Sequence, residues 1–166
     1  MTFADLFDKS GLFFAVLGMA LAAALPGWGS AKGVGTAGKA AAGAITEEPS
    51  LFGKVLVLQL LPGTQGIYGF LIAIIPMTSI GLMGDPVQMS FGMGLCYFAA
   101  CLPVAIGCYF SAIHQGTTSV ASINVVAKRP DQFGKAMLFP VMVETYAILT
   151  MLISLLAVTN VANLPL

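Results

Sequence analysis

The sequence is short of charge. Of its 166 residues only 8% are charged, seven basic and seven acidic, whereas an ordinary soluble domain has about 25%. Hydrophobic residues make up 58% of the chain, so its charged side chains cannot cover the surface of a soluble domain. The composition argues against a soluble enzyme, a nucleic-acid-binding protein and a disordered protein, and it favours a membrane protein.

Cysteine and N-terminal basic residues are also scarce. The three cysteines, Cys96, Cys101 and Cys108, lie in one apolar segment without a Cys-x-x-Cys pair, which favours simple packing. The N-terminal residues MTFADLFDKSG lack the basic region of a cleaved signal peptide. We therefore expect the first apolar segment to be retained.

Four apolar stretches have the roughly 20 residues that a membrane-spanning helix needs. They cover residues 11–45, 53–82, 88–127 and 134–160. The short connections between them, 47–50, 84–86 and 128–132, make successive helices antiparallel neighbours. The sequence thus predicts an all-α membrane protein with four transmembrane helices.

The two halves of the chain resemble each other at a constant offset of 81 residues (130 − 49 = 81). Residues Pro49, Phe52, Gly53 and Lys54 recur as Pro130, Phe133, Gly134 and Lys135. The same offset relates Ser30 to Ser111 and Thr64 to Thr145, without a gap. This pattern predicts two tandem duplicated hairpins, 1–86 and 87–166, that run in the same direction.

The positions of the basic side chains predict the orientation of the chain in the membrane. Lys54, Lys128, Arg129 and Lys135 flank the first and third connections, and Lys9 alone lies on the opposite side. The positive-inside rule places the loops near 47–54 and 128–135 in the cytoplasm and both termini outside.

Glycine-rich residues 27–43 contain a Gly-x-Gly-x-x-Gly pattern and part of a phosphate-binding loop. Ala40 stands where that loop offers Ser or Thr, and no strand precedes the segment, so nucleotide binding is not expected. Small residues instead let helices approach closely in lipid, as on the inner wall of a ring.

One carboxylate lies inside a predicted span. Asp5 and Asp8 are in the N-terminal tail, four further acids are in connections, and Glu144 alone interrupts an apolar run. Because an unpaired charge in the bilayer costs several kcal/mol, Glu144 is a functional candidate. The alternative is a protonated glutamate tolerated in a helix interface.

Polar groups of two other spans lie at the depth of Glu144. On the second span one helical face carries Leu61, Thr64, Gln65 and Tyr68, and Pro62 beside them is expected to free backbone carbonyls. Gln115 lies on the third span, and about 14–15 residues separate each group from a cytoplasmic connection, or roughly 21–24 Å. One carboxylate with neutral oxygens suits a monovalent cation. Since the repeat counterpart of Glu144 is Gly63, one site per chain is expected.

At these residues the chain resembles the duplicated proteolipid (c or K) subunit of V-type rotary ATPases, and in particular the bacterial sodium-transporting branch. The segments that carry the resemblance are LQLLPGTQGIYGF (58–70), SAKGVG (30–35) and MVETYAIL (142–149). The resemblance implies a rotor-ring subunit in a bacterial plasma membrane that carries Na⁺ during ATP-driven rotation.

The resemblance also implies residue roles and partners. Na⁺ would be held by Glu144, Gln115, Thr64, Gln65 and the backbone carbonyl of Leu61, with Tyr68 orienting the carboxylate. The partners would be further copies in a ring, a stator subunit with an essential arginine, a central-stalk subunit at the cytoplasmic loops, and lipid, but no nucleic acid. Other subunits would hydrolyse ATP, and this chain would catalyse no covalent step.

Three alternatives remain open at this point. A proton-carrying rotor subunit would have similar residues, although its site needs only the carboxylate. A stand-alone four-helix channel or exporter usually has inverted repeats or several ionisable groups along a path. A structural membrane role would leave Glu144 incidental. The single histidine, His114, is expected to be structural or to face a lumen rather than a metal.

Overall fold

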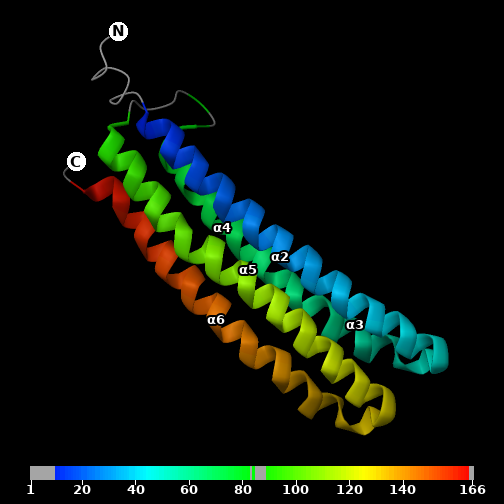
Figure 1. Cartoon of the computed structure of the whole chain (residues 1–166). Helices are drawn as coiled ribbons and strands as arrows, with labels where there is room; N and C mark the ends of the chain where they lie inside the picture. Colours follow the sequence, from blue (N-terminus) through cyan, green and yellow to red (C-terminus); the bar gives the residue numbers. More distant parts are fainter. Residues whose placement is uncertain (1–9, 83, 85–88, 165–166) are drawn as a thin grey trace.

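A computed structural model describes residues 10–82, 84 and 89–164 of the chain. Within these residues the fold is helical, without strands, and the long helices run side by side as an elongated bundle (Figure 1). The helices are α2 (Gly11–Glu47), α3 (Phe52–Leu60), α4 (Thr64–Ser79), α5 (Phe91–Lys128) and α6 (Phe133–Asn160). Short 3₁₀ turns lie at Pro49–Leu51, Leu61–Gly63, Pro130–Gln132 and Val161–Asn163.

The prediction of four membrane-crossing segments is confirmed by length and composition. The four continuous helical segments are Gly11–Glu47, Pro49–Ser79, Phe91–Lys128 and Pro130–Asn163. The first and third connections are shorter than predicted, because Pro49 and Pro130 each begin a new helical turn directly after Glu48 and Arg129. In the first connection, hydrogen bonds from Ser50 lower the pKa of the exposed Glu48 carboxyl.

The second connection is longer than predicted. Helix α4 ends at Ser79, and α5 begins at Phe91, so the expected bounds of 82 and 88 were wrong by three residues each. Gly81 follows α4 with a φ of 67°, a conformation that glycine adopts without strain. The expected boundary between the hairpins, at 86 and 87, lies outside the described residues, as does Lys9.

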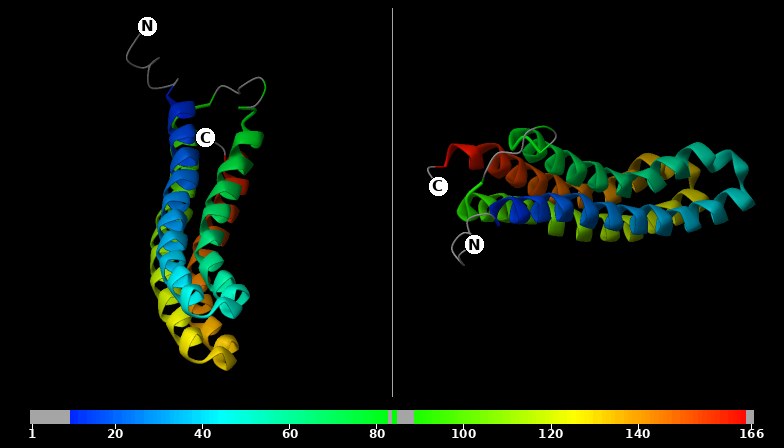
Figure 2. Two further views of the ribbon diagram at one scale, coloured as in Figure 1. Left: turned by 90° about the vertical axis from the view of Figure 1, so that its right-hand side faces the viewer. Right: turned by 90° about the horizontal axis from the view of Figure 1, so that it is seen from above.

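The four segments form two antiparallel hairpins, which we call hairpin 1 (α2 with α3 and α4) and hairpin 2 (α5 with α6). Helix α2 packs along α5, while α4 lies against α2 and α6 against α5. Figure 2 shows the two tight connections at one end of the bundle, and the start of α2 and the end of α6 at the other.

Backbone contact between α2 and α5 depends on glycine. A Cβ atom on Gly33 would overlap the carbonyl oxygen of Ala112, and one on Gly18 would lie 2.7 Å from the Cα of Phe98. The small residues of α2 therefore serve helix packing, as the sequence suggested.

Replacing Gly33 by alanine is expected to destabilise the bundle by about 1–3 kcal/mol, because the added methyl group overpacks a backbone contact. Gly43→Ala is the matched control on the same helix, since nothing lies within 4 Å of its Cβ position. That control should be neutral or slightly stabilising, because alanine is the better helix former. Thermal unfolding of the detergent-solubilised variants measures both effects. Equal midpoints for the two variants would contradict the close α2–α5 contact.

Two separate clusters of buried apolar residues fill the bundle. One contains Ala15, Ile72, Tyr97 and Val158, toward the start of α2 and the end of α6. The other contains Ala37, Leu58, Ile123 and Ala136, toward the tight connections. Along α3 and α4, along α5 and along α6, the predicted site residues Thr64, Gln65, Gln115 and Glu144 lie between the residues of these two clusters. A polar layer thus separates two apolar cores.

Candidate cation site

Helix α6 directs the carboxylate of Glu144 toward α4, and four side chains donate hydrogen bonds to it. The hydroxyls of Thr64 and Tyr68 each lie 2.7 Å from Oε1. The amide nitrogens of Gln115 and Gln65 lie 2.7 and 3.2 Å from Oε2. The structure therefore brings together polar residues of α4, α5 and α6, although up to 80 residues separate them in the sequence.

A helix break positions the α4 side of the site. Pro62 has no backbone N–H, and the 3₁₀ turn Leu61–Gly63 interrupts the helix where the sequence predicted a loosened turn. The carbonyl of Leu61 accepts hydrogen bonds from the backbone N–H of Thr64 and from its hydroxyl, 3.0 Å away. The turn thus places a backbone oxygen beside the Thr64 side chain.

Several oxygens crowd around the Thr64 hydroxyl. It lies 2.7 Å from Oε1 of Glu144, 3.0 Å from the Leu61 carbonyl and 3.3 Å from Oε1 of Gln65. A hydroxyl has one hydrogen and can satisfy only one of these acceptors well. A cation among the same oxygens would be attracted to all of them.

Two buried amides hold each other in place. Gln65 and Gln115 are both completely buried, and Nε2 of Gln65 lies 2.5 Å from Oε1 of Gln115. Nε2 of Gln115 also donates to the carbonyl of Pro140, at 2.9 Å. Because both amides are tied to their neighbours, their oxygens have restricted positions near the carboxylate.

Two serines that the sequence analysis did not assign to the site support it. The N–H of Gly66 donates to Ser30 at 2.8 Å, and Ser111 donates to the carbonyl of Val143 at 3.1 Å. Outside the site, toward the tight connections, Ser122 donates to the Ala136 carbonyl, which lacks its helical partner because residue 140 is proline. The sequence contained one signal for these serines, because Ser30 and Ser111 are repeat mates and lie on α2 and α5, the two helices that pack along each other.

No cationic side chain neutralises Glu144 within the part of the chain that the structure describes. Its neighbours are neutral amides and hydroxyls, and the Glu144 side chain itself is half-buried. A carboxylate in this setting can hold a proton or a cation.

The equivalent position in hairpin 1 has no such site. There Gly63 replaces Glu144 and Val34 replaces Gln115, and Cγ2 of Val34 lies 3.6 Å from the Cβ position of Gly63. The described residues therefore contain this carboxylate cluster once.

Other residues noted in the sequence lie elsewhere. Lys32, Lys39 and His114 are exposed, and His114 lines a pocket between α5 and α6 instead of contacting Glu144. These residues take no part in the carboxylate cluster.

Comparison with known proteins finds two relatives that match most of this chain. The chain is 49% identical over 153 residues to the V-type sodium ATPase subunit K of Enterococcus hirae, across 92% of this chain and 95% of that protein. It is 39% identical over 150 residues to the A-type ATP synthase subunit K of Methanocaldococcus jannaschii, across 90% of this chain and 64% of that protein.

The family of ATP synthase C subunits matches residues 17–75 and, separately, 98–157. The resemblance to proteolipid subunits of rotary ATPases is confirmed by these matches. Each half of the chain thus contains one family repeat, and the chain belongs to the ATP synthase C-subunit family.

Proposed function

We propose that this chain is a membrane rotor subunit that binds Na⁺ at Glu144 and carries it across the bilayer during ATP-driven rotation. The observation that carries the proposal is the cluster of oxygens from Thr64 and Leu61 around the Glu144 carboxylate. The Enterococcus hirae relative, a V-type sodium ATPase subunit, supports the same conclusion.

The proposed ligands are all oxygens. They are a carboxylate oxygen of Glu144, the hydroxyl of Thr64, the amide oxygens of Gln65 and Gln115, and the carbonyl of Leu61. Oxygen ligands are those that hard cations prefer, and a single negative charge balances a monovalent ion. Tyr68 donates to Oε1 and orients the carboxylate without binding the ion.

A proton is the alternative cargo, and the ligand set argues against it. A proton needs only the carboxylate, and the half-buried hydroxyl of Thr64 and two fully buried amides would then have no role in binding. We therefore favour Na⁺ over H⁺.

The transport cycle follows from electrostatics. Facing lipid, Glu144 must be neutralised by the bound ion, because a bare carboxylate there is too costly. We propose that a stator arginine displaces the ion and allows exchange, and that other subunits hydrolyse ATP. The membrane voltage contributes about 2.3 kcal/mol per charge per 100 mV.

The remaining partners and the location follow from the orientation. We propose a bacterial plasma membrane, with the connections near 47–54 and 128–135 facing the cytoplasm and a central-stalk subunit. Both termini would lie outside. The exposed Lys128, Arg129 and Lys135 near one end of the bundle support this orientation.

Carbodiimide labelling tests the cargo. The reagent modifies protonated carboxyls, so Na⁺ bound at Glu144 should slow labelling of that residue at constant pH, in proportion to site occupancy. Choline chloride at the same ionic strength is the control and should give no protection. Labelling of Glu144 that is unaffected by saturating Na⁺ would overturn the sodium assignment and favour H⁺.

Tyr68→Phe is expected to weaken Na⁺ binding by about tenfold, because it removes one hydrogen bond to a charged group while keeping the ring. Tyr146→Phe is the matched control, since the Tyr146 hydroxyl has no hydrogen-bond partner among the described residues. Equilibrium binding of ²²Na⁺ to the purified protein measures both variants. Equal affinities would remove Tyr68 from the proposed site.

A further inference from the structure

One face of α5 carries a row of buried polar side chains. Its members, Ser111, Gln115, Ser119 and Ser122, follow one another at intervals of three or four residues, so they lie along one side of the helix. The most exposed of them, Ser111, has an exposed fraction of only 6%. The row extends from the level of Glu144 toward the tight connections, into the apolar core there.

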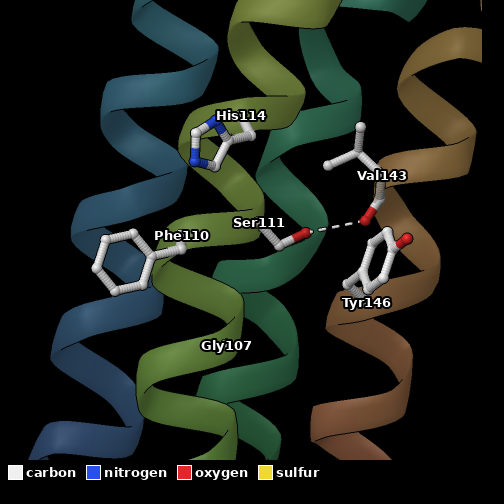
Figure 3. Close-up of a pocket in the computed structure, with 6 residues that line it drawn as sticks. All are labelled: Gly107, Phe110, Ser111, His114, Val143 and Tyr146. Carbon is white, nitrogen blue, oxygen red and sulfur yellow. Dashed lines mark hydrogen bonds between the residues drawn. The ribbon is translucent and has the colours of Figure 1, made fainter.

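Three members of this row donate hydrogen bonds to backbone carbonyls of α6. The pairs are Ser111 with Val143 at 3.1 Å, Gln115 with Pro140 at 2.9 Å, and Ser122 with Ala136 at 2.8 Å. Figure 3 shows the first of these bonds, between α5 and α6. Each bond satisfies a side chain that the fold has removed from water, as is usual for buried polar groups.

Ser119 is the member of the row that has no such bond. Its exposed fraction is 0%, and its hydroxyl has no hydrogen-bond partner among the described residues. Within that part of the chain it is the one fully buried side-chain polar atom of which this is true. Native structures rarely bury an unpaired hydroxyl, because the lost hydration is then not replaced. Ser119 therefore points to a further group that pairs with it.

Helix α6 offers a suitable acceptor at the level of Ser119. Along α5, Ser119 lies between Gln115 and Ser122, which bond the carbonyls of Pro140 and Ala136. Because proline has no N–H, the Ala136 carbonyl receives no helical hydrogen bond from residue 140. A carbonyl oxygen can accept two hydrogen bonds, so the Ala136 oxygen can accept a second donor beside Ser122.

Hairpin 1 shows what fills the equivalent space in the other repeat. The residues 81 positions before Ser119 and Pro140 are Gly38 and Gln59. There the amide nitrogen of Gln59 lies 2.7 Å from the position that a Cβ on Gly38 would occupy. In hairpin 2 the proline ring closes back on its own backbone nitrogen, so no amide reaches over the helix. Serine adds only a Cβ and a hydroxyl, so it replaces only part of the amide group.

We propose that Ser119 binds a buried water molecule between α5 and α6, one helical turn from Gln115 on the side of the tight connections. The water pairs with the Ser119 hydroxyl and donates to the Ala136 carbonyl, in the place that the Gln59 amide has in hairpin 1. Buried waters in proteins commonly bridge polar groups that have no other partner. The site is about 6 Å along α5 from Gln115, and it stands apart from the proposed Na⁺ transport.

The groups at this level favour water over a second cation. Ser119 and Ser122 are neutral, and neither makes a hydrogen bond to a carboxylate of the described residues. Leu58 and Ile123, both fully buried, belong to the apolar cluster at this end of the bundle. A cation without a counter-charge would be costly in such surroundings, whereas water is neutral and both donates and accepts hydrogen bonds.

Thermal unfolding of the detergent-solubilised full chain tests the pairing of Ser119. If its hydroxyl binds water, Ser119→Ala loses a satisfied hydrogen bond, and the unfolding midpoint should fall by a few degrees. If the hydroxyl is unpaired, the same change should raise the midpoint, because alanine removes the cost of burying it. Ser122→Ala is the matched control on the same face, and its midpoint should fall because it loses the bond to Ala136.

A midpoint for Ser119→Ala at or above that of the wild type would overturn the proposed water site. ²²Na⁺ binding by the same variants is measured separately, so a failure of the water site is distinguishable from a failure of the ion site.

Electron cryo-microscopy of the full chain, at a resolution that shows ordered waters, identifies the ligand directly. The wild type should show density within about 3.2 Å of both the Ser119 hydroxyl and the Ala136 carbonyl oxygen. Ser119→Val should lack this density, because a methyl group replaces the hydroxyl and fills its surroundings. A wild-type map in which Ser119 bonds a backbone carbonyl directly, without such density, would overturn the proposal. Density that is lost when choline replaces Na⁺ would also overturn it, since the ligand would then be a second cation.

Discussion

Replacing Glu144 by glutamine is expected to abolish Na⁺ binding and ion-coupled transport. Glutamine has the size of glutamate and an oxygen that can still accept from Thr64 and Tyr68, but it removes the only charge of the site. Two unit charges 4 Å apart attract by about 4 kcal/mol at an effective dielectric constant of 20, which corresponds to about a thousandfold in affinity. Equilibrium ²²Na⁺ binding to the purified chain measures this loss directly.

Glu48→Gln is the matched control, because Glu48 is an exposed acid in the first connection. It should bind Na⁺ like the wild type. In the assembled complex, Na⁺-stimulated ATP hydrolysis should be lost with Glu144→Gln and kept with Glu48→Gln. Sodium binding of normal affinity by the Glu144→Gln protein would exclude the proposed site and leave Glu144 with a structural role.

Thr64→Val is expected to reduce Na⁺ affinity by about 10- to 100-fold. Valine keeps the shape of threonine but removes the hydroxyl that lies between the Leu61 carbonyl and the Glu144 carboxylate. A polar contact to a charged group contributes about 1.5–3 kcal/mol, which gives the expected range. The measurement is ²²Na⁺ binding as a function of concentration at constant pH.

The duplication supplies the control for this experiment. Thr145 is the repeat mate of Thr64, and its hydroxyl donates to the Met142 carbonyl at 2.5 Å as Thr64 donates to that of Leu61. Thr145 is nevertheless exposed, and its hydroxyl makes no hydrogen bond to a carboxylate among the described residues. Thr145→Val should leave Na⁺ affinity unchanged. If Thr64→Val also left it unchanged, the hydroxyl would not be a ligand. Proton transport would then be the better account of Glu144.

Prediction from the sequence was most successful for the membrane spans, the repeat and the single acid within a span. Apolar runs of sufficient length defined four spans, and a gapless offset of 81 residues related the halves. With so few acids, each could be placed individually, and Glu144 alone remained inside a span. These inferences needed only local pattern and the energetic cost of charge in lipid.

Helix ends were predicted less well. Pro49 and Pro130 start 3₁₀ turns almost directly after the preceding helix, so the first and third connections are shorter than predicted. Helix α4 ends at Ser79, before the predicted position 82. Hydropathy is insensitive to such ends, because polar residues can continue a helix beyond the apolar run. Proline and glycine chemistry, rather than hydropathy, decides where each turn stops.

By itself, the sequence determined the four spans, the duplication and the candidate residues. Only the tertiary structure decided which atoms meet, such as Gln115 with the Pro140 carbonyl and Ser30 with the Gly66 amide, and which repeat mates remain uncovered. The reason is geometric: each residue turns a helix by about 100°, so contacts between helices depend on the rotation and spacing of whole helices. Glycine contacts between α2 and α5 set that spacing here, and a local pattern cannot specify it.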